Sequence, residues 1–174
     1  MQLIFCVESN KTNRSDWIYL KELMDHYYGV NPHEVKYSTV FLGGKTKYND
    51  STTRNQIAVF KKQYQATGKN RVSKVIYVMD TDDYDSNPAD AQFYSRIREF
   101  CEANSFDLIW FCKDIERVFW DSKVADHEKK REAERFRKSG RISSIDEKQL
   151  NRVIETNGAS NVLLVLDKYI ARKA

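Results

Sequence analysis

The chain has 174 residues, of which 41% are hydrophobic and 31% charged, a composition typical of one globular domain with a substantial core. Its net charge of +4 permits a nucleic-acid partner without requiring one. Two Pro and six Gly argue against long linkers, and no apolar run approaches membrane-spanning length. The apolar N-terminal segment is too short for a signal peptide and lacks a basic start. We therefore expect a cytoplasmic protein without a membrane partner.

Four apolar, β-prone runs alternate with helical patterns over the first two thirds of the chain. The predicted strands are residues 3–7, 35–42, 75–79 and 106–112. The predicted helices are residues 17–28, with Asp16 as the N-cap, 51–67 and 89–104. This order predicts an α/β fold, with a four-stranded parallel sheet flanked by helices and right-handed crossovers.

The C-terminal third is more polar. A short amphipathic stretch, residues 115–120, precedes an almost wholly polar run, residues 121–141. That run reads either as a solvated helix or partly disordered insertion, or as an arm that contacts nucleic-acid phosphates. The candidate phosphate contacts in it are Lys129, Lys130, Arg131 and Arg137.

Two more helices are predicted, one capped by Ser143 or Ser144 and ending near residue 157, and one over residues 160–172. We expect a single domain, with residues 1–113 as the α/β core and residues 114–174 as a charged helical extension that packs back on it. The three Cys lie in apolar stretches without metal-ligand spacing, which indicates buried free thiols in a reducing compartment.

Acidic residues follow two of the predicted strands. Glu8 follows the first strand, and Asp80 and Asp82 follow the third. Two carboxylates spaced by two on an extended segment point to the same side and repel each other unless a cation lies nearby. If the two strands are neighbours, all three acids meet at one edge of the sheet, where oxygen ligands suit Mg²⁺ or Mn²⁺. The alternative is a solvated acidic turn or a helix cap.

Other charged residues could join this edge. Glu116, just past the fourth strand, is a fourth candidate metal ligand or else a surface residue, and Lys113 could balance the acids or contact a phosphate during catalysis. Lys45 and Lys47 follow Gly43-Gly44, whose flexible backbone would let them approach a nucleic acid. The spacing of a phosphate-binding P-loop is absent there.

Glu8 and the motif Asp80-Thr81-Asp82, each at the end of a strand, resemble the Toprim catalytic domain over residues 3–112. Within that family the chain looks most like the small RloB-like or abortive-infection group related to OLD nucleases. Glu116 in the segment DIERVFW resembles a further Glu of that group, and the tail NGASNVLLVLDKYI resembles it more loosely.

The resemblance implies a Mg²⁺- or Mn²⁺-dependent nuclease acting on DNA or RNA. Glu8 would be a metal ligand or general acid/base, and Asp80 and Asp82 would be metal ligands. A role in phage defence, a partner ATPase and a homodimer are further implications. Ser9-Asn10 replaces the Gly that usually follows the first acid, so the alternative is a non-catalytic binding or regulatory subunit of a nucleic-acid-processing complex.

Two other classes fit the pattern less well. A phosphoacceptor receiver domain needs an acid pair after its first strand, where Glu8-Ser9 supplies one acid. A phosphatase of the haloacid dehalogenase type places its Asp-x-Asp motif after the first strand, whereas here the motif follows the third.

Overall fold

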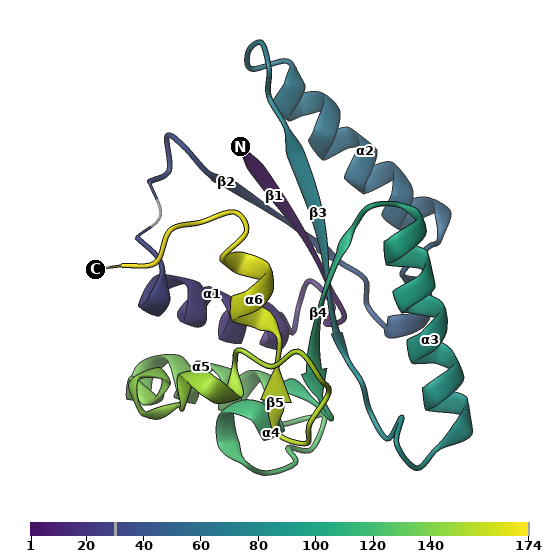
Figure 1. The fold of residues 1–174 in the computed structure, drawn as a ribbon, viewed down its shortest axis with the longest axis vertical. Coiled ribbons are helices and arrows are strands. Elements are labelled where there is room, and N and C mark those ends of the chain that lie inside the picture. The colour runs from purple at the N-terminus through teal and green to yellow at the C-terminus, as the bar shows by residue number, and fades with distance from the viewer. Residues whose placement is uncertain (30, 174) are drawn as a thin grey trace.

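The computed structural model describes residues 1–29 and 31–173 of the chain (Figure 1), so the last position of the predicted extension lies outside the described residues. In chain order, the strands and helices are β1 (Gln2–Val7), α1 (Ser15–Tyr27), β2 (Lys36–Phe41), α2 (Ser51–Gln65), β3 (Ser73–Asp80), α3 (Pro88–Ala103), β4 (Asp107–Cys112), α4 (Ile115–Trp120), α5 (Lys129–Ser139), β5 (Ala159–Ser160) and α6 (Val162–Leu166). Short 3₁₀ turns occupy Lys45–Lys47, Arg141–Ser144 and Glu147–Gln149.

The sheet has the strand order β2-β1-β3-β4-β5, and its first four strands run parallel. This confirms the predicted α/β class and the predicted parallel strands. The predicted count of four strands was wrong, because β5 pairs antiparallel with the end of β4 and places Ser160 beside Phe111. A two-residue strand is too short to carry the alternation by which strands are predicted.

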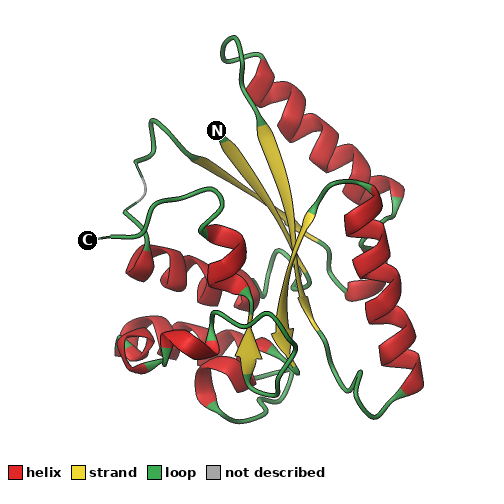
Figure 2. Ribbon diagram, viewed as in Figure 1, coloured by secondary structure: helices red, strands yellow, loops and turns green. Residues whose placement is uncertain are grey.

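Both faces of the sheet are covered by helices, which explains the continuous apolar runs of its central strands. Leu3, Phe5 and Val7 of β1 belong to a core shared with α1, α4, α5 and α6. Ile4 and Cys6, on the opposite side of the same strand, belong to a second core with α2 and α3. Figure 2 shows these two groups of helices on opposite sides of the strands.

The outer edge of β4 is completed by a side chain. Beyond the short pairing with β5, the Asn161 carboxamide accepts a hydrogen bond from the Trp110 N–H (2.9 Å) and donates one to the Leu108 carbonyl (2.9 Å). Ser160 Oγ donates to the Trp110 carbonyl at 2.6 Å. These bonds satisfy backbone groups that a neighbouring strand would otherwise have satisfied.

A side chain caps the first turn of α2, α3 and α4, whereas α1, α5 and α6 start without such a hydrogen bond. Asp50 caps α2 through the Thr53 N–H (2.7 Å), and Asn87 caps α3 directly before Pro88. The prediction that Asp16 caps α1 was wrong, because Arg14 occupies the N-cap position. The Asp16 carboxylate instead accepts the backbone N–H of Ser9 at 2.8 Å.

The polar run contains a helix with one buried stripe. Ala133 and Phe136 of α5 are fully buried, and the Phe136 ring lies 5.1 Å from that of Tyr19 in α1 and 4.9 Å from that of Phe119 in α4. Only these two positions of α5 are buried, and its other residues face the solvent or are partly covered. The segment therefore reads as almost wholly polar although it contains a helix that packs on the core.

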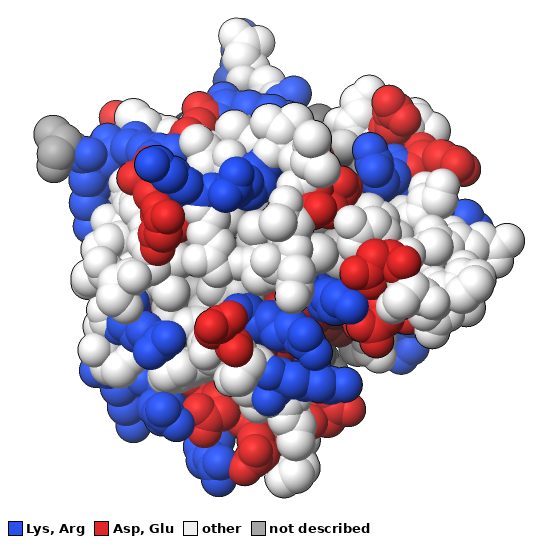
Figure 3. Space-filling view, turned by 60° about the horizontal axis from the view of Figure 1, so that its bottom comes forward, with Lys and Arg blue, Asp and Glu red and all other residues white. Residues whose placement is uncertain are grey.

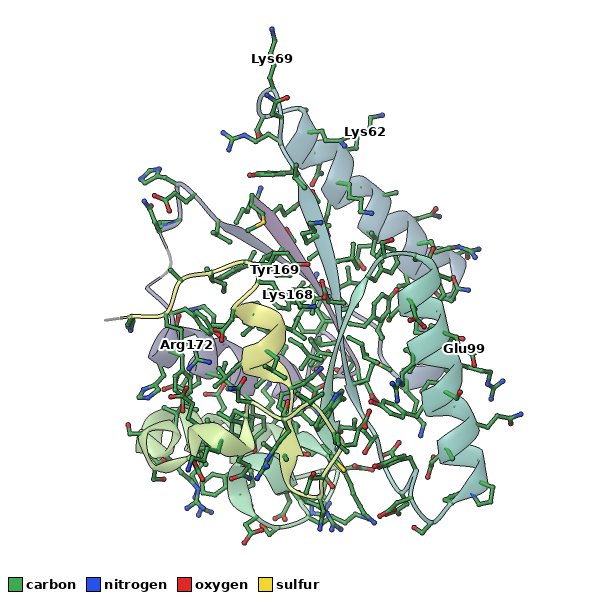
Figure 4. All side chains as sticks on the ribbon, in the orientation of Figure 1. Lys62, Lys69, Glu99, Lys168, Tyr169 and Arg172 are labelled. Carbon is green, nitrogen blue, oxygen red and sulfur yellow. The ribbon has the colours of Figure 1, made fainter. Side chains whose placement is uncertain are left out.

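The two helices predicted for the C-terminal tail were largely wrong. Residues 141–149 form two 3₁₀ turns, and α6 covers only five residues of the predicted 160–172 helix. Val153 and Ile154, through which the first of these helices was predicted to run, are 81% and 74% exposed. Without burial of an apolar face a short helix has little to stabilise it. Figure 4 shows Lys168 and Tyr169 just beyond α6, where both side chains contact Asp107 of β4.

Cys6, Cys101 and Cys112 are free and buried, and all three belong to the core under α2 and α3. Among residues 1–29 and 31–173 no helix has the length and apolar character needed to cross a membrane.

Candidate active site at the carboxyl edge of the sheet

Glu8 and Asp80 meet where two neighbouring parallel strands end. Glu8 follows β1 directly, and Asp80 is the last residue of β3. The Glu8 side chain crosses between the strands, and its Oε1 accepts the backbone N–H of Asp80 at 2.8 Å. The two predicted acids are therefore held side by side, at the edge where ligands bind in open α/β sheets.

Asp80 also reaches the segment that follows β4. Its Oδ1 accepts the backbone N–H of Ile115 at 3.0 Å, in the first turn of α4. The next residue, Glu116, is fully buried, and neither of its carboxylate oxygens accepts a hydrogen bond within the described part of the chain. Buried carboxylates without hydrogen-bond donors are rare in folded proteins, which makes Glu116 a candidate site residue. The sequence pattern alone left Glu116 undecided between a site residue and a surface residue.

A cation from α5 faces this carboxylate. Lys129 Nζ lies 3.8 Å from Glu116 Oε2 and 3.6 Å from Asp126 Oδ1. The predicted phosphate contact Lys129 is therefore directed into the acidic cluster. Burial disfavours the ammonium form of Lys129, but the charges of Glu116, Asp80 and Asp16 outweigh that effect and raise its pKa.

Asp82 departs from the expected geometry. The extended backbone stops at Asp80, and Asp82 has a left-handed φ of 50°, so the two acids do not share one side of a strand. The Asp82 carboxylate forms an ion pair with Lys45, whose Nζ also contacts Asp90 at 3.0 Å. Asp82 still lines the same hollow as Asp80.

The other predicted basic residues lie around the acids rather than among them. Lys113 pairs with Asp83 and Asp85 at 3.0 and 3.1 Å, and Lys47 is exposed. Lys130 donates to the Thr12 carbonyl at 3.1 Å. Two arginines of α5 pair with glutamates of the same segment, Arg131 with Glu128 and Glu132, and Arg137 with Glu134.

Two hollows flank the acids, and Asp80, Asp126 and Lys129 line both. One, of about 210 Å³, also contains Asp82, and the other, of about 360 Å³, also contains Glu8. Figure 3 turns forward the end of the molecule that lies at the bottom of Figure 1, and basic and acidic side chains are interleaved there. Glu8, Asp80 and Asp82 are thus accessible to a small ion and border a surface with cations, whereas Glu116 lines neither hollow.

Burial and mutual repulsion weaken the acidity of the cluster. Burial is the main cause that raises the Glu8 pKa to about 8, and the charges of Asp16 and Asp82 add to it. Burial, followed by the Glu8 charge, raises the pKa of Asp80 well above its ordinary value. Burial raises the Glu116 pKa to about 7, although Lys129 opposes the shift.

A divalent cation suits these donors chemically. Hard oxygen ligands whose ionised forms are disfavoured by burial and repulsion would be stabilised by Mg²⁺ or Mn²⁺. Within residues 1–29 and 31–173, no three His, Cys, Asp or Glu residues are already arranged as a metal cage. Mg²⁺ commonly uses only one or two carboxylates and retains several waters, and Glu8 and Asp80, which line the same hollow, are the residues that could supply them.

The sequence prediction missed two acids of the site, Asp16 and Asp126. Asp16 lies at the start of α1, the first element after β1, and its carboxylate accepts the Ser9 N–H beside Glu8. Its position directly after a β–α loop was a usable signal, because such loops lie at the carboxyl edge of a parallel sheet. Asp126 lay in the polar run without any pattern to distinguish it.

The chain matches no protein-family model, no curated protein and no solved structure.

Proposed function

We propose that this protein is a Toprim-like nuclease of the RloB-like type that hydrolyses phosphodiester bonds of DNA or RNA with the help of Mg²⁺ or Mn²⁺. The observation that carries the proposal is the meeting of Glu8 and Asp80 at the carboxyl edge of the sheet, where Asp80 also accepts the N–H of Ile115, the residue before the buried Glu116. Four parallel strands with Asp80 ending the third agree with the sequence resemblance.

Asp80 would hold the metal ion, with Glu8 beside it. When bound, the ion would polarise the phosphodiester and lower the pKa of an attacking water. Asp82 would join the ligands only by releasing Lys45.

Glu8 is suited to move a proton. With a pKa of about 8, its carboxyl group is populated in both protonation states near neutral pH. Its Oε1 is engaged by the Asp80 N–H, so Oε2 is the atom that would carry the proton. Lys113, at the rim of the hollow that contains Asp80, is placed to contact a phosphate if it releases Asp83 and Asp85.

The experiment compares wild type with Asp80→Asn in two assays, Mn²⁺ titration by calorimetry and cleavage of labelled DNA and RNA with Mg²⁺ or with EDTA. Asp25→Asn is the matched control, because Asp25 is an exposed partner of Lys21 on α1. We expect Asp80→Asn to abolish metal binding and to lower cleavage by about 100-fold or more, the loss of several kcal/mol of charge stabilisation. Cleavage by Asp80→Asn at the wild-type rate would overturn the proposal.

A second candidate is a non-catalytic binding or regulatory subunit. It is favoured by Ser9-Asn10 in place of the family's Gly and by the internal cations Lys129 and Lys45, which already balance acids of the site. Metal binding without cleavage of any nucleic acid would favour this candidate. In either case, a role in phage defence and a partner ATPase remain proposals from the resemblance.

A further inference from the structure

A third hollow, of about 420 Å³, lies between α1 and α5, outside the two hollows at the acids. We call it the α1–α5 groove and define it by the residues Arg14, Trp17, Lys21, Lys130, Glu134 and Arg137. Its two walls are held together by the contact between the Tyr19 and Phe136 rings beneath it. The groove is therefore a fixed feature of the fold.

The groove carries four cations against one acid. Arg14 and Lys130 are exposed, and the hydrogen bonds of their side chains go to the backbone carbonyls of Lys11 (2.8 Å) and Thr12 (3.1 Å). Within the described residues neither has a carboxylate partner, whereas Lys21 and Arg137 pair with Asp25 and Glu134. The unbalanced charge is thus concentrated at Arg14 and Lys130, and it suits an anionic ligand.

Trp17 adds an aromatic surface to this charge. Its ring packs at 5.6 Å against Phe5 of β1 and remains partly exposed in the groove. An aromatic ring between exposed cations is the combination by which proteins bind single-stranded nucleic acid, since bases stack on the ring while phosphates meet the charges. An acidic peptide would use the cations but has no bases to stack on the ring.

The groove leads to the carboxylate site. Asn13 lines both the groove and the hollow that contains Glu8 and Asp80. On the opposite wall, Lys130 of the groove follows directly after Lys129 of the site. A strand lying in the groove would therefore bring a neighbouring phosphodiester to the acids.

We propose that the α1–α5 groove binds a single-stranded segment of DNA or RNA next to the carboxylate site, with Arg14 and Lys130 on phosphates and Trp17 against a base. The inference rests on the proposed function for the identity of its ligand, and it deepens that function by assigning the path of the substrate. DNA and RNA share the phosphates and bases that this geometry would recognise.

The test measures binding of fluorescently labelled dT and rU 12-mers to the full chain by anisotropy, in EDTA and at several salt concentrations. The test variant is Arg14→Gln/Lys130→Gln, and the matched control is Lys62→Gln/Lys69→Gln, which removes the same charge. Figure 4 shows Lys62 and Lys69 directed away from the molecule at the far end of α2. All four positions are exposed, so both variants are expected to fold, which thermal melting checks.

We expect the test variant to bind the oligonucleotides about tenfold more weakly than wild type. The salt slope, which is the slope of the logarithm of affinity against the logarithm of salt concentration, should fall in magnitude by about 0.7 for each lost phosphate contact, whereas the control variant should keep the wild-type slope. The Trp17→Leu variant should bind about tenfold more weakly and lose the quenching of tryptophan fluorescence by the oligonucleotide. The ratio of dT to rU affinity identifies the preferred strand.

Equal salt slopes in wild type and the test variant, or equal losses in the test and control variants, would overturn the inference. Competition by an acidic peptide as strong as that by the oligonucleotide would also overturn it, because the groove would then be a protein-docking surface. Because binding is measured without metal, failure of the nuclease proposal is separately visible: oligonucleotides would bind through the groove but would not be cleaved when Mg²⁺ is added.

Discussion

The ammonium group of Lys129 lies 3.8 Å from Oε2 of Glu116, a fully buried carboxylate that accepts no hydrogen bond within the described residues. Lys129 belongs to α5 and Glu116 to α4, so this ion pair depends on how α5 packs against the rest of the fold. Lys129 supplies positive charge where a metal ion would also be attracted. The pair therefore links the stability of the fold to the chemistry of the site.

Replacing Lys129 by Gln should have opposite effects on stability and on metal binding. The free energy of unfolding without metal should fall by roughly 1–3 kcal/mol, less than for a fully buried pair because Lys129 is about a quarter exposed. Mn²⁺ should bind about tenfold more tightly, since a competing charge is removed. Chemical denaturation and calorimetry measure the two quantities, with Lys130→Gln as the control. Weaker Mn²⁺ binding by Lys129→Gln would contradict this account.

The metal-free protein should lose stability as the pH rises. Glu8 has a folded pKa of about 8, above its ordinary value of 4.5, so between these values the folded state binds more protons than the unfolded state. The stabilisation is fully present below pH 4.5 and is lost as the pH rises through about 8. Asp80 and Glu116 shift in the same direction. Chemical denaturation from pH 5 to pH 9 measures how the free energy of unfolding changes with pH, and the Glu8→Gln variant should show a smaller change. Greater stability of the wild type at pH 9 than at pH 5 would exclude this explanation.

Replacing Asn161 by Leu should destabilise the protein by about 2 kcal/mol. The Trp110 N–H and the Leu108 carbonyl would then lose their hydrogen-bond partner at the edge of β4. Asn151→Leu is the matched control at an exposed position and should change stability by less than about 0.5 kcal/mol. Similar unfolding midpoints for the two variants would mean that water replaces the carboxamide without loss.

Removing the Phe136 ring should affect both the fold and the site. We expect Phe136→Ala to lower the free energy of unfolding by about 3–5 kcal/mol, the usual range for a buried aromatic ring. Val153→Ala, at an 81% exposed position, should be nearly neutral. Because Phe136 anchors α5, Phe136→Ala should also alter Mn²⁺ affinity through Lys129. An unchanged affinity in a folded Phe136→Ala variant would show that α5 does not need this anchor to position Lys129.

The parts of the fold that could be predicted from sequence are those with a repeating apolar pattern. The runs at β1 and β3 are buried on both faces, and α2 and α3 carry an apolar stripe together with a capping residue. The meeting of Glu8 and Asp80 was predicted on the condition that their strands are neighbours, and the pairing of β1 with β3 meets that condition. The bounds of the strands shifted by only one or two residues from those predicted.

The remainder depends on contacts between distant segments. Lys129 appeared as one basic residue among many, and it comes to face Glu116 because α5 packs on α1, with Ala133 and Phe136 in the core. Similarly, residues 141–161 of the tail bury scattered side chains such as Ile142 and Leu150 and are tied to β4 by the Asn161 carboxamide, contacts that leave no periodic signal. Asp82 departed from its expected direction because the backbone turns left-handed directly after the strand.

The three buried cysteines give the molecule an uneven chemical sensitivity. Burial raises the pKa of the Cys6 and Cys112 thiols and raises that of Cys101 to about 12, so their reactive thiolate forms are scarce until they are exposed. All three lie under α2 and α3, whereas Trp120 lies on the other side of the sheet, where its indole N–H donates to the Tyr19 hydroxyl at 2.9 Å. Thiol labelling therefore reports the opening of the layer under α2 and α3. Trp120 fluorescence, isolated by replacing Trp17 and Trp110, reports the opening of the other layer, because Trp110 is buried beside the cysteines. The two signals together give the order in which the layers come apart.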